Sequence, residues 1–190
     1  MPDPESADRE LVESAQRGDL QAFNALVARW EPKVYNYLLR CTGNRDDALD
    51  LCQEAFFKAY RGLGGLAAAD RFPSWLFRIA HNAMVSSGRR KRPAGDGEGL
   101  DRLADLASLP RSRLGGFGYG GAELAYLVEQ ALNTLPGPQR EAVLLKLHHG
   151  FKFREIADIL ACPISTVKSR LYAGIDALRE LLEPVRTRSE

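Results

Sequence analysis

The sequence predicts an all-α protein made of two small helical domains joined by a Gly-rich flexible linker. Apolar residues recur at spacings of three and four over most of the chain, which is the period of a helix. No strand-like alternation of apolar and polar residues rises above this signal. Eight of the 17 glycines fall within residues 94–122, and such a composition cannot bury a core. We therefore place the linker there, between domains at residues 8–93 and 123–184.

Composition excludes several classes of protein. The 190 residues are 45% hydrophobic and 27% charged, close to a globular average and unlike a disordered chain. Apolar runs such as Ala142–Leu145 are far shorter than the ~20 residues that cross a bilayer. The acidic, polar start of the chain does not read as a secretory signal. We therefore expect a cytoplasmic protein without membrane insertion.

Charge is segregated along the chain although the formal net charge is only +1. The first 25 residues hold six acidic side chains against two basic ones. A later run is wholly basic and consists of Arg89, Arg90, Lys91 and Arg92. This pattern predicts one surface for an acidic partner and other surfaces that avoid it.

The first half of the first domain reads as helices followed by a loop. Apolar residues recur from Leu11 to Leu38, and Pro32 inside this pattern predicts a kink or a junction. Asn44 suits an N-cap, with acids in the first turn, so a helix should run from there to about Tyr60. Its buried face comprises Ala48, Leu51, Cys52, Ala55, Phe56 and Ala59. Residues 62–70 form a loop of small residues.

The next helix starts near Pro73 and has two distinct faces. The apolar face, expected in the core, comprises Phe72, Trp75, Leu76, Ile79, Ala80 and Ala83. The polar face comprises Ser74, Arg78, His81 and Asn82. Because the polar face continues into the basic run at residues 89–92, it is the more informative of the two.

The second domain is predicted to contain four helices, the last two of which have the pattern of a helix-turn-helix. The small Ala157 suits the place where two helices cross, Ala161 occupies the turn, and Val167 faces inward. The rest of the small core comprises Ile156, Leu160, Ile164 and Leu171. The second helix of such a unit presents its early residues to base edges in the major groove. Here those residues are Ser165, Thr166, Lys168, Ser169 and Tyr172, with Arg170 nearby. Any helical hairpin with a solvated basic face would show the same spacing.

Short segments in both domains carry a resemblance to one family. In the first domain they are Asp50–Phe56, Lys58–Tyr60 and Phe72–Asn82. In the second domain they are Leu135–Arg140, Glu155–Ala157 and Cys162–Leu171. In order and spacing the chain resembles an extracytoplasmic-function (ECF) sigma factor, a small subunit that directs bacterial RNA polymerase to promoters. The resemblance implies core RNA polymerase and promoter DNA as partners, with an anti-sigma regulator common in the family.

The same resemblance implies a role for individual residues. The set implied to bind polymerase is Asp50, Gln53 and Glu54. The set implied to meet the minus-ten element is Lys58, Arg78, His81 and Asn82, with Arg89, Arg90, Lys91 and Arg92 on the backbone upstream. The set implied to engage the minus-thirty-five element is Arg140, Lys168, Ser169 and Arg170, with Lys168 and Ser169 best placed for base edges.

The chain departs from the family pattern at several positions. The base-capture loop at residues 62–70 has Leu66 and Ala67 where an aromatic residue followed by arginine is common. Ser86 replaces a usual aspartate. Ala173 and Ile175 replace common arginines in the last helix, which implies a weaker grip on the DNA backbone there.

No catalytic group, cofactor or metal site is expected. The chain has three cysteines, Cys41, Cys52 and Cys162, whose odd number and spacing fit neither a disulfide framework nor a zinc site. His148 and His149, with Glu155, are the one tempting metal set, but neighbouring histidines point to different sides of a helix.

Two other classes of protein remain compatible with the residues. A helix-turn-helix repressor or activator that acts without polymerase would explain the second domain, but not the acidic helix or the Trp75–Asn82 segment. A helical adaptor that binds only protein would keep its function if its basic surface were neutralised.

Overall fold

The chain folds into helices, as the sequence predicts. A computed structural model describes residues 4–91 and 119–186, and no strand occurs among them. Contacts group the described helices into two compact units, one of residues 4–91 and one of most of residues 119–186. Arg92 and most of the predicted linker lie outside the described residues. Within those residues, no helix combines the length and apolar character needed to cross a membrane.

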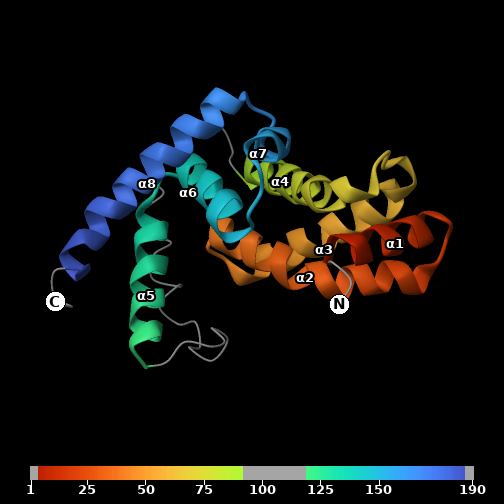
Figure 1. The fold of residues 1–190 in the computed structure, drawn as a ribbon, viewed down its shortest axis with the longest axis horizontal. Helices are drawn as coiled ribbons and strands as arrows, with labels where there is room; N and C mark the ends of the chain where they lie inside the picture. The colour runs from red at the N-terminus through yellow and green to blue at the C-terminus, as the bar shows by residue number, and fades with distance from the viewer. Residues whose placement is uncertain (1–3, 92–118, 187–190) are drawn as a thin grey trace. The chain divides into compact units, whose positions relative to one another are not determined.

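In the part of the chain that the structure describes, four α-helices and two short 3-10 turns build the first domain, and four α-helices with one π-helical turn build the second (Figure 1). The first domain contains α1 (Pro4–Gln16), α2 (Leu20–Thr42), α3 (Arg45–Gly62), η1 (Leu63–Gly65), η2 (Ala69–Arg71) and α4 (Phe72–Lys91). The second contains α5 (Tyr119–Thr134), α6 (Gly137–Val143), the π-helical η6 (Leu144–His148), α7 (Phe153–Leu160) and α8 (Ile164–Arg186). The end of the predicted linker, residues 119–122, is therefore helical.

Local capping groups set the junction between helices in the first domain. Asp19 is the N-cap of α2, and the hydrogen bond it accepts from the Ala22 N–H lowers the pKa of Asp19. Gly43 ends α2 in the left-handed conformation, at φ 68°, which glycine adopts without strain. Asn44, the predicted N-cap, accepts the N–H of Asp47 at 3.0 Å and starts α3.

An aromatic cluster between α2 and α4 forms much of the core of the first domain. Trp30 lies edge-on to Phe72 and Phe77, with ring centroids 6.4 and 6.5 Å apart. Tyr37 lies 5.2 Å from Phe77. Phe77 is fully buried although the sequence analysis placed it outside the apolar stripe. Because α4 packs against both α2 and α3, its buried face is wider than one stripe, whereas Trp75 lies half-buried at the edge.

The predicted junction at Pro32 is absent, because α2 runs through this residue as one helix. A proline has no N–H to offer the carbonyl of Ala28 one turn before it. Both residues lie on the exposed side of α2, where water can hydrate that carbonyl. Trp30 and Val34, on the other side, are buried in the core and hold the helix in place.

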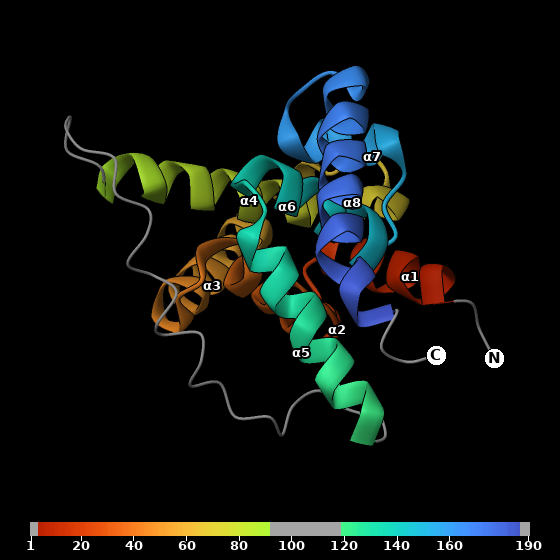
Figure 2. The same cartoon turned by 90° about the vertical axis from the view of Figure 1, so that its left-hand side faces the viewer.

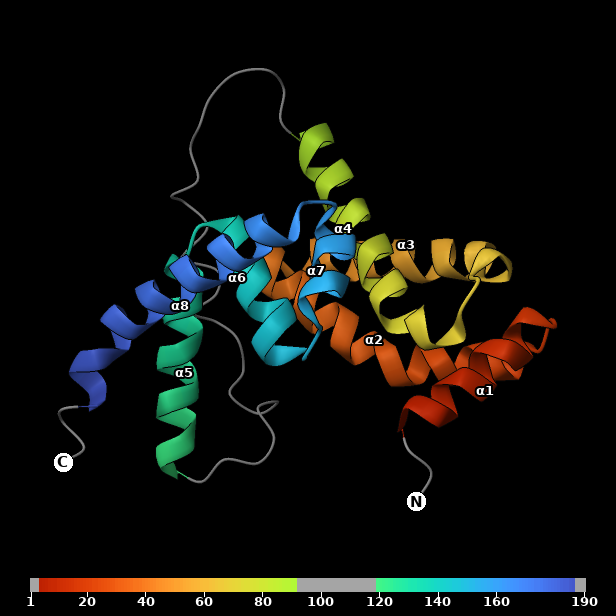
Figure 3. The same ribbon diagram turned by 45° about the horizontal axis from the view of Figure 1, so that its top comes forward.

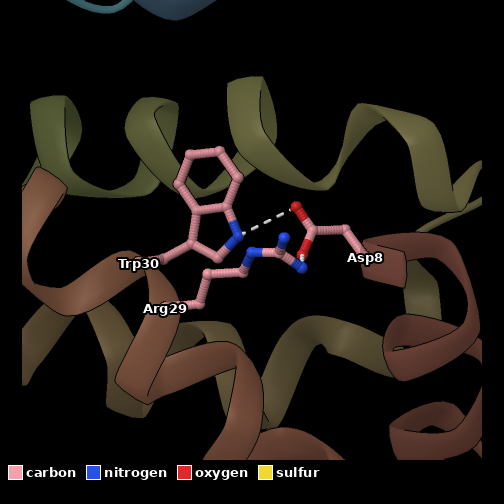
Figure 4. A network of polar contacts seen from close by, with 3 residues as sticks. All are labelled: Asp8, Arg29 and Trp30. Atoms are coloured by element: carbon pink, nitrogen blue, oxygen red, sulfur yellow. Dashed lines mark hydrogen bonds and ion pairs between the residues drawn. The ribbon is translucent and has the colours of Figure 1, made fainter. Parts of the chain in front are cut away.

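One buried carboxylate ties α1 to α2, which lie side by side in the first domain (Figure 3). Asp8 is only 7% exposed. Its carboxylate accepts a hydrogen bond from Arg29 Nη1 at 2.8 Å and one from the indole Nε1 of Trp30 at 3.2 Å (Figure 4). The spacing of residues around Asp8 does not indicate this burial, because both donors lie 21 or more residues away in the chain. These two hydrogen bonds compensate the cost of burying the Asp8 charge, and one of them gives the indole N–H of Trp30 its acceptor.

We predict that Asp8→Ala destabilises the first domain by about 1–3 kcal/mol, because the buried indole N–H of Trp30 loses its acceptor. Urea unfolding followed by tryptophan fluorescence measures this, since both tryptophans, Trp30 and Trp75, lie in this domain. Glu13→Ala, at an exposed position of the same helix, is the control and should stay within about 0.5 kcal/mol of wild type. Equal stability of the two variants would show that the buried carboxylate does not hold α1.

The second domain depends on a close approach of α6 and α8 (Figure 2). A Cβ atom at Gly174 would lie 2.8 Å from Cγ2 of Val143 and 3.4 Å from the carbonyl oxygen of Gln139. Around this contact, a small core of buried side chains comprises Leu135, Ala142, Val143 and Leu171. Only a residue without a side chain lets the two helices pack at this distance.

The helix-turn-helix has the predicted geometry, with one exception. Ala161 takes φ 48° at the turn, and the N–H of Cys162 bonds to the carbonyl of Ala157 at 3.1 Å. Val167 is fully buried, as predicted. Ile164, predicted to be in the core, is 42% exposed. It is the first residue of α8 and lies before Val167, the first buried residue of that helix.

We predict that Gly174→Ala destabilises the second domain by about 1–3 kcal/mol through overpacking against Val143. Hydrogen exchange should be faster in α6 and α8, while tryptophan fluorescence, which reports the first domain, stays unchanged. Gly137→Ala is the matched control, because a Cβ there meets open space. Wild-type hydrogen-exchange rates in the Gly174 variant would mean that α6 and α8 can move apart without a loss of folding stability.

Candidate nucleic-acid and protein interfaces

The polar face of α3 brings two of the predicted sets together. Asp50 and Gln53 are exposed and Glu54 is half-buried. Glu54 Oε1 forms an ion pair with Lys58 Nζ at 2.6 Å, one helical turn further on. The family resemblance implies a polymerase contact for Glu54 and a DNA contact for Lys58, and the structure pairs these two side chains with each other. Exposed pairs of this kind contribute about 0.2–1 kcal/mol, so either partner can exchange at little cost.

An exposed aromatic residue, Phe57, adjoins this face. Phe57 is 62% exposed, and the guanidinium of Arg61 lies 5.7 Å from its ring centroid. Together with Glu54, Lys58 and Gly62 these residues line a shallow surface depression. Phe57 lies outside the buried stripe of α3, and its place in the helical spacing is the sequence signal of this exposure. Such residues contribute strongly when a partner covers them.

The polar face of α4 presents the predicted melting residues in register. Arg78 and Asn82 are exposed and one turn apart, and His81 beside them is half-buried. Asparagine offers both donors and acceptors to a base edge, and arginine can hold phosphate or stack on an exposed base. The helix continues through Arg89 to Lys91, so the basic run extends the same element.

The loop between α3 and α4 is more ordered than its small residues suggested. It contains the 3-10 turns η1 and η2, and Leu63 is buried beneath it. The side-chain amide of Gln16 donates to the carbonyls of Leu63 and Leu66, at 3.0 and 2.8 Å. Ser74 Oγ donates to the carbonyl of Arg71 at 3.1 Å. The role of Gln16 is not predictable from the sequence, because nothing near it in the chain indicates a partner about fifty residues away.

The recognition helix α8 presents its predicted residues mostly on one exposed face. Exposed side chains at helical spacing are Ser165, Lys168, Ser169 and Tyr172, while Thr166 and Arg170 are half-buried. Lys168 Nζ lies 5.5 Å from the ring centroid of Phe153, a cation–π contact that holds it beside α7. Arg170 Nη1 contacts Cys162 Sγ at 3.9 Å, so Arg170 packs against the turn.

Arg140 occupies a structural position within the second domain. Its Nη2 donates to the carbonyl oxygens of Asn133 and Leu135, at 2.7 and 3.0 Å. These are carbonyls at the C-terminal end of α5, which carry the negative end of the helix dipole. The guanidinium therefore joins α5 to α6. The phosphate contact expected of Arg140 stays a prediction.

No feature of the described residues indicates redox or metal chemistry. Among residues 4–91 and 119–186, no group of three or more His, Cys, Asp or Glu could hold a metal ion. Burial, with a smaller effect of the Glu31 carboxylate, raises the pKa of Cys52 to about 12. Its thiol stays protonated and unreactive at neutral pH.

Comparison with solved structures supports the helical arrangement. CnrH, solved in complex with the cytosolic domain of CnrY, matches with a TM-score of 0.65 and 27% identity, over 94% of this chain and 98% of that chain. The sigma factor RpoE from Bartonella quintana, solved with the anti-sigma factor NepR, matches with a TM-score of 0.68 over 86% of this chain and 98% of that chain. At 24% identity, RpoE supports the fold alone.

Sequence relatives cover nearly the whole chain. Residues 26–93 match Sigma-70 region 2 and residues 126–178 match Sigma-70 region 4. The RNA polymerase sigma-H factor of Pseudomonas aeruginosa is 35% identical over 94% of this chain and 95% of its own length. The ECF RNA polymerase sigma-E factor of Escherichia coli K12 is 33% identical over the same shares. With both regions present in order, the chain belongs to the sigma-70 family as an ECF sigma factor, a non-enzymatic protein that directs RNA polymerase to promoters.

Proposed function

We propose that this sigma factor uses three separate surfaces to bind core polymerase, to open the promoter and to recognise its upstream element. The polar face of α3 binds core polymerase, the polar face of α4 with the preceding loop opens the minus-ten element, and the early part of α8 reads the minus-thirty-five element. The observation that carries the proposal is the division of α4. Its buried aromatic face fixes the helix in the core, while Arg78 and Asn82 project together on the exposed side.

Charge and apolar area support the polymerase surface. Asp50 and Glu54 present carboxylates to a basic partner, and the adjoining Phe57 ring adds apolar area at the contact. A basic group of polymerase could replace Lys58 as the partner of Glu54, because the surface pair is weak. Lys58 would then become available to promoter phosphate.

Promoter opening requires capture of bases rather than covalent chemistry. Taking one base out of the stack costs a few kcal/mol. Contacts of Asn82 with a base edge and of Arg78 with phosphate or a base face offset that cost. The half-buried His81 lies beside them, and the basic run from Arg89 to Arg92 holds the duplex upstream.

Contacts at the minus-thirty-five element follow from the exposed face of α8. Lys168 and Ser169 would reach base edges, with Ser165, Thr166 and Tyr172 beside them. Arg170 and Arg140, both held by protein contacts, would act from the edge of this surface on phosphate.

We also propose a cytoplasmic location and restraint by an anti-sigma protein. A protein that acts on RNA polymerase and promoter DNA works where they are. The similarity to CnrH, solved with a protein bound to it, supports a protein partner besides polymerase. The exposed rings of Phe57 and Tyr60 offer such a partner apolar area.

Neither alternative interpretation of the sequence is retained. A polymerase-independent regulator would require the second domain alone, and an adaptor would not require the basic surfaces. Relatives named as RNA polymerase sigma factors align along 94% of the chain, through both domains.

We predict that Asp50→Lys combined with Glu54→Lys weakens binding to core polymerase by at least roughly ten-fold, because the reversed charges repel a basic partner. Titration of labelled protein with core polymerase measures the Kd. The control pair is Glu10→Lys with Glu13→Lys, at exposed acids of α1. Wild-type affinity in the α3 variant would remove the polymerase assignment of this face.

We predict that Arg78→Ala combined with Asn82→Ala leaves polymerase binding intact but reduces promoter opening by roughly ten-fold or more, since base and phosphate contacts are lost. Permanganate reactivity of unpaired thymines measures opening. Arg9→Ala combined with Asn24→Ala changes the same residue types at exposed positions of α1 and α2. Full opening with the α4 variant would show that this face is an ordinary solvent-exposed surface with no role in promoter opening.

A further inference from the structure

Gln16, the last residue of α1, grips the loop that leads into α4. Its Nε2 donates one hydrogen bond to the carbonyl of Leu63 and one to the carbonyl of Leu66. These two carbonyls belong to the first residue of η1 and to the residue that follows it, and the N–H of Leu66 also bonds to the Leu63 carbonyl. Gln16 therefore fastens both ends of a single turn. Two acceptors require a group with two N–H donors, which a glutamine amide provides and a carboxylate does not.

The exposed half of the turn that Gln16 binds, residues 64–67, has no buried side chain of its own. Gly64 and Gly65 stand at its centre, and a Cβ at either would meet open space. Adjacent glycines lose more conformational entropy on ordering than any other pair of residues. Leu63 is buried and anchors the start of the turn, whereas Leu66 is half-buried and Ala67 is exposed. The side-chain amide of Gln16 therefore acts together with the Leu66 N–H bond to hold the exposed half of the turn.

The hydrogen bonds of Gln16 are connected to the core of the domain through α1. Asp8 fixes α1 on α2 through Arg29 and Trp30, and α1 packs against both 3-10 turns of the loop. Gln16 is itself half-buried, two turns of helix beyond Asp8, so its amide is held in place. A continuous series of contacts thus runs from the buried carboxylate to the loop.

We propose that Gln16 is a positioning residue for promoter opening, holding residues 63–66 in the shape that receives an unstacked base of the minus-ten element. The inference rests on the proposed function, in which this loop acts with α4 on the opened strand. A preformed loop captures the base without first being ordered, so less of the contact energy is lost. Gln16 touches no DNA in this role.

The test uses the full chain bound to core polymerase, with Gln16→Ala and the isosteric Gln16→Glu, which lacks the amide donors. We expect opening of a duplex promoter, measured with permanganate, to fall by roughly ten-fold in both variants, as the loss of two hydrogen bonds implies. A template with a premelted minus-ten bubble should restore most of the signal, because unstacking is then already done. Affinity for core polymerase should stay at the wild-type value.

A second measurement separates positioning from general stability. Hydrogen exchange should become faster in residues 63–71 of both variants, while α2 and α3 keep their wild-type protection. Gln21→Ala, at an exposed glutamine of α2, is the matched control and should change neither opening nor exchange. Loss of polymerase binding, or equal defects on duplex and bubble templates, would make Gln16 merely structural and overturn the proposal.

The outcomes also separate this inference from the proposed function. Wild-type opening with Gln16→Ala, alongside failure of the Arg78 and Asn82 variant, would overturn the positioning role and leave the α4 surface intact. A duplex-specific defect with Gln16→Ala, alongside full opening by the α4 variant, would support the loop and reject the α4 face.

Discussion

The first domain depends on the burial of the Asp8 carboxylate between α1 and α2. A charge at 7% exposure is tolerable because Arg29 and the indole of Trp30 both donate to it. Trp30 is at the same time a member of the aromatic cluster with Phe72 and Phe77. One polar contact therefore links the first helix to the core that orients α4. The exposed faces of α3 and α4 owe their separation to the same packing, since each helix turns its apolar stripe inward.

Features with local causes were predictable from the sequence. Helix ends follow capping residues such as Asn44, whose side chain satisfies a backbone N–H three residues away. The helix-turn-helix was recognisable because its constraints lie within a few residues of one another, from Ala157 to Val167. Exposed polar residues of α4 were predictable as the complement of the apolar stripe.

Features with distant causes were not predictable in this way. Asp8 and Gln16 have partners 21 or more residues away, and no periodicity encodes such a pairing. Phe77 is buried because α4 meets two helices, which depends on tertiary packing. Arg140 has the charge expected of a phosphate ligand, yet it joins α5 to α6 through backbone carbonyls. Residue type alone does not distinguish a buried polar link from an exposed recognition group.

The position of α1 has a consequence for how the domain is divided. The match to Sigma-70 region 2 begins at residue 26, after α1 has ended at Gln16. A fragment cut at that boundary would lack the buried Val12, leave the Trp30 indole without its acceptor and leave the 63–66 turn without its side-chain donor. The smallest autonomous unit that could be excised for transplantation into another sigma factor therefore extends back through α1 at least to Asp8. Chimeras joined at the edge of the family match would inherit a region 2 that lacks α1 and the contacts of Asp8 and Gln16.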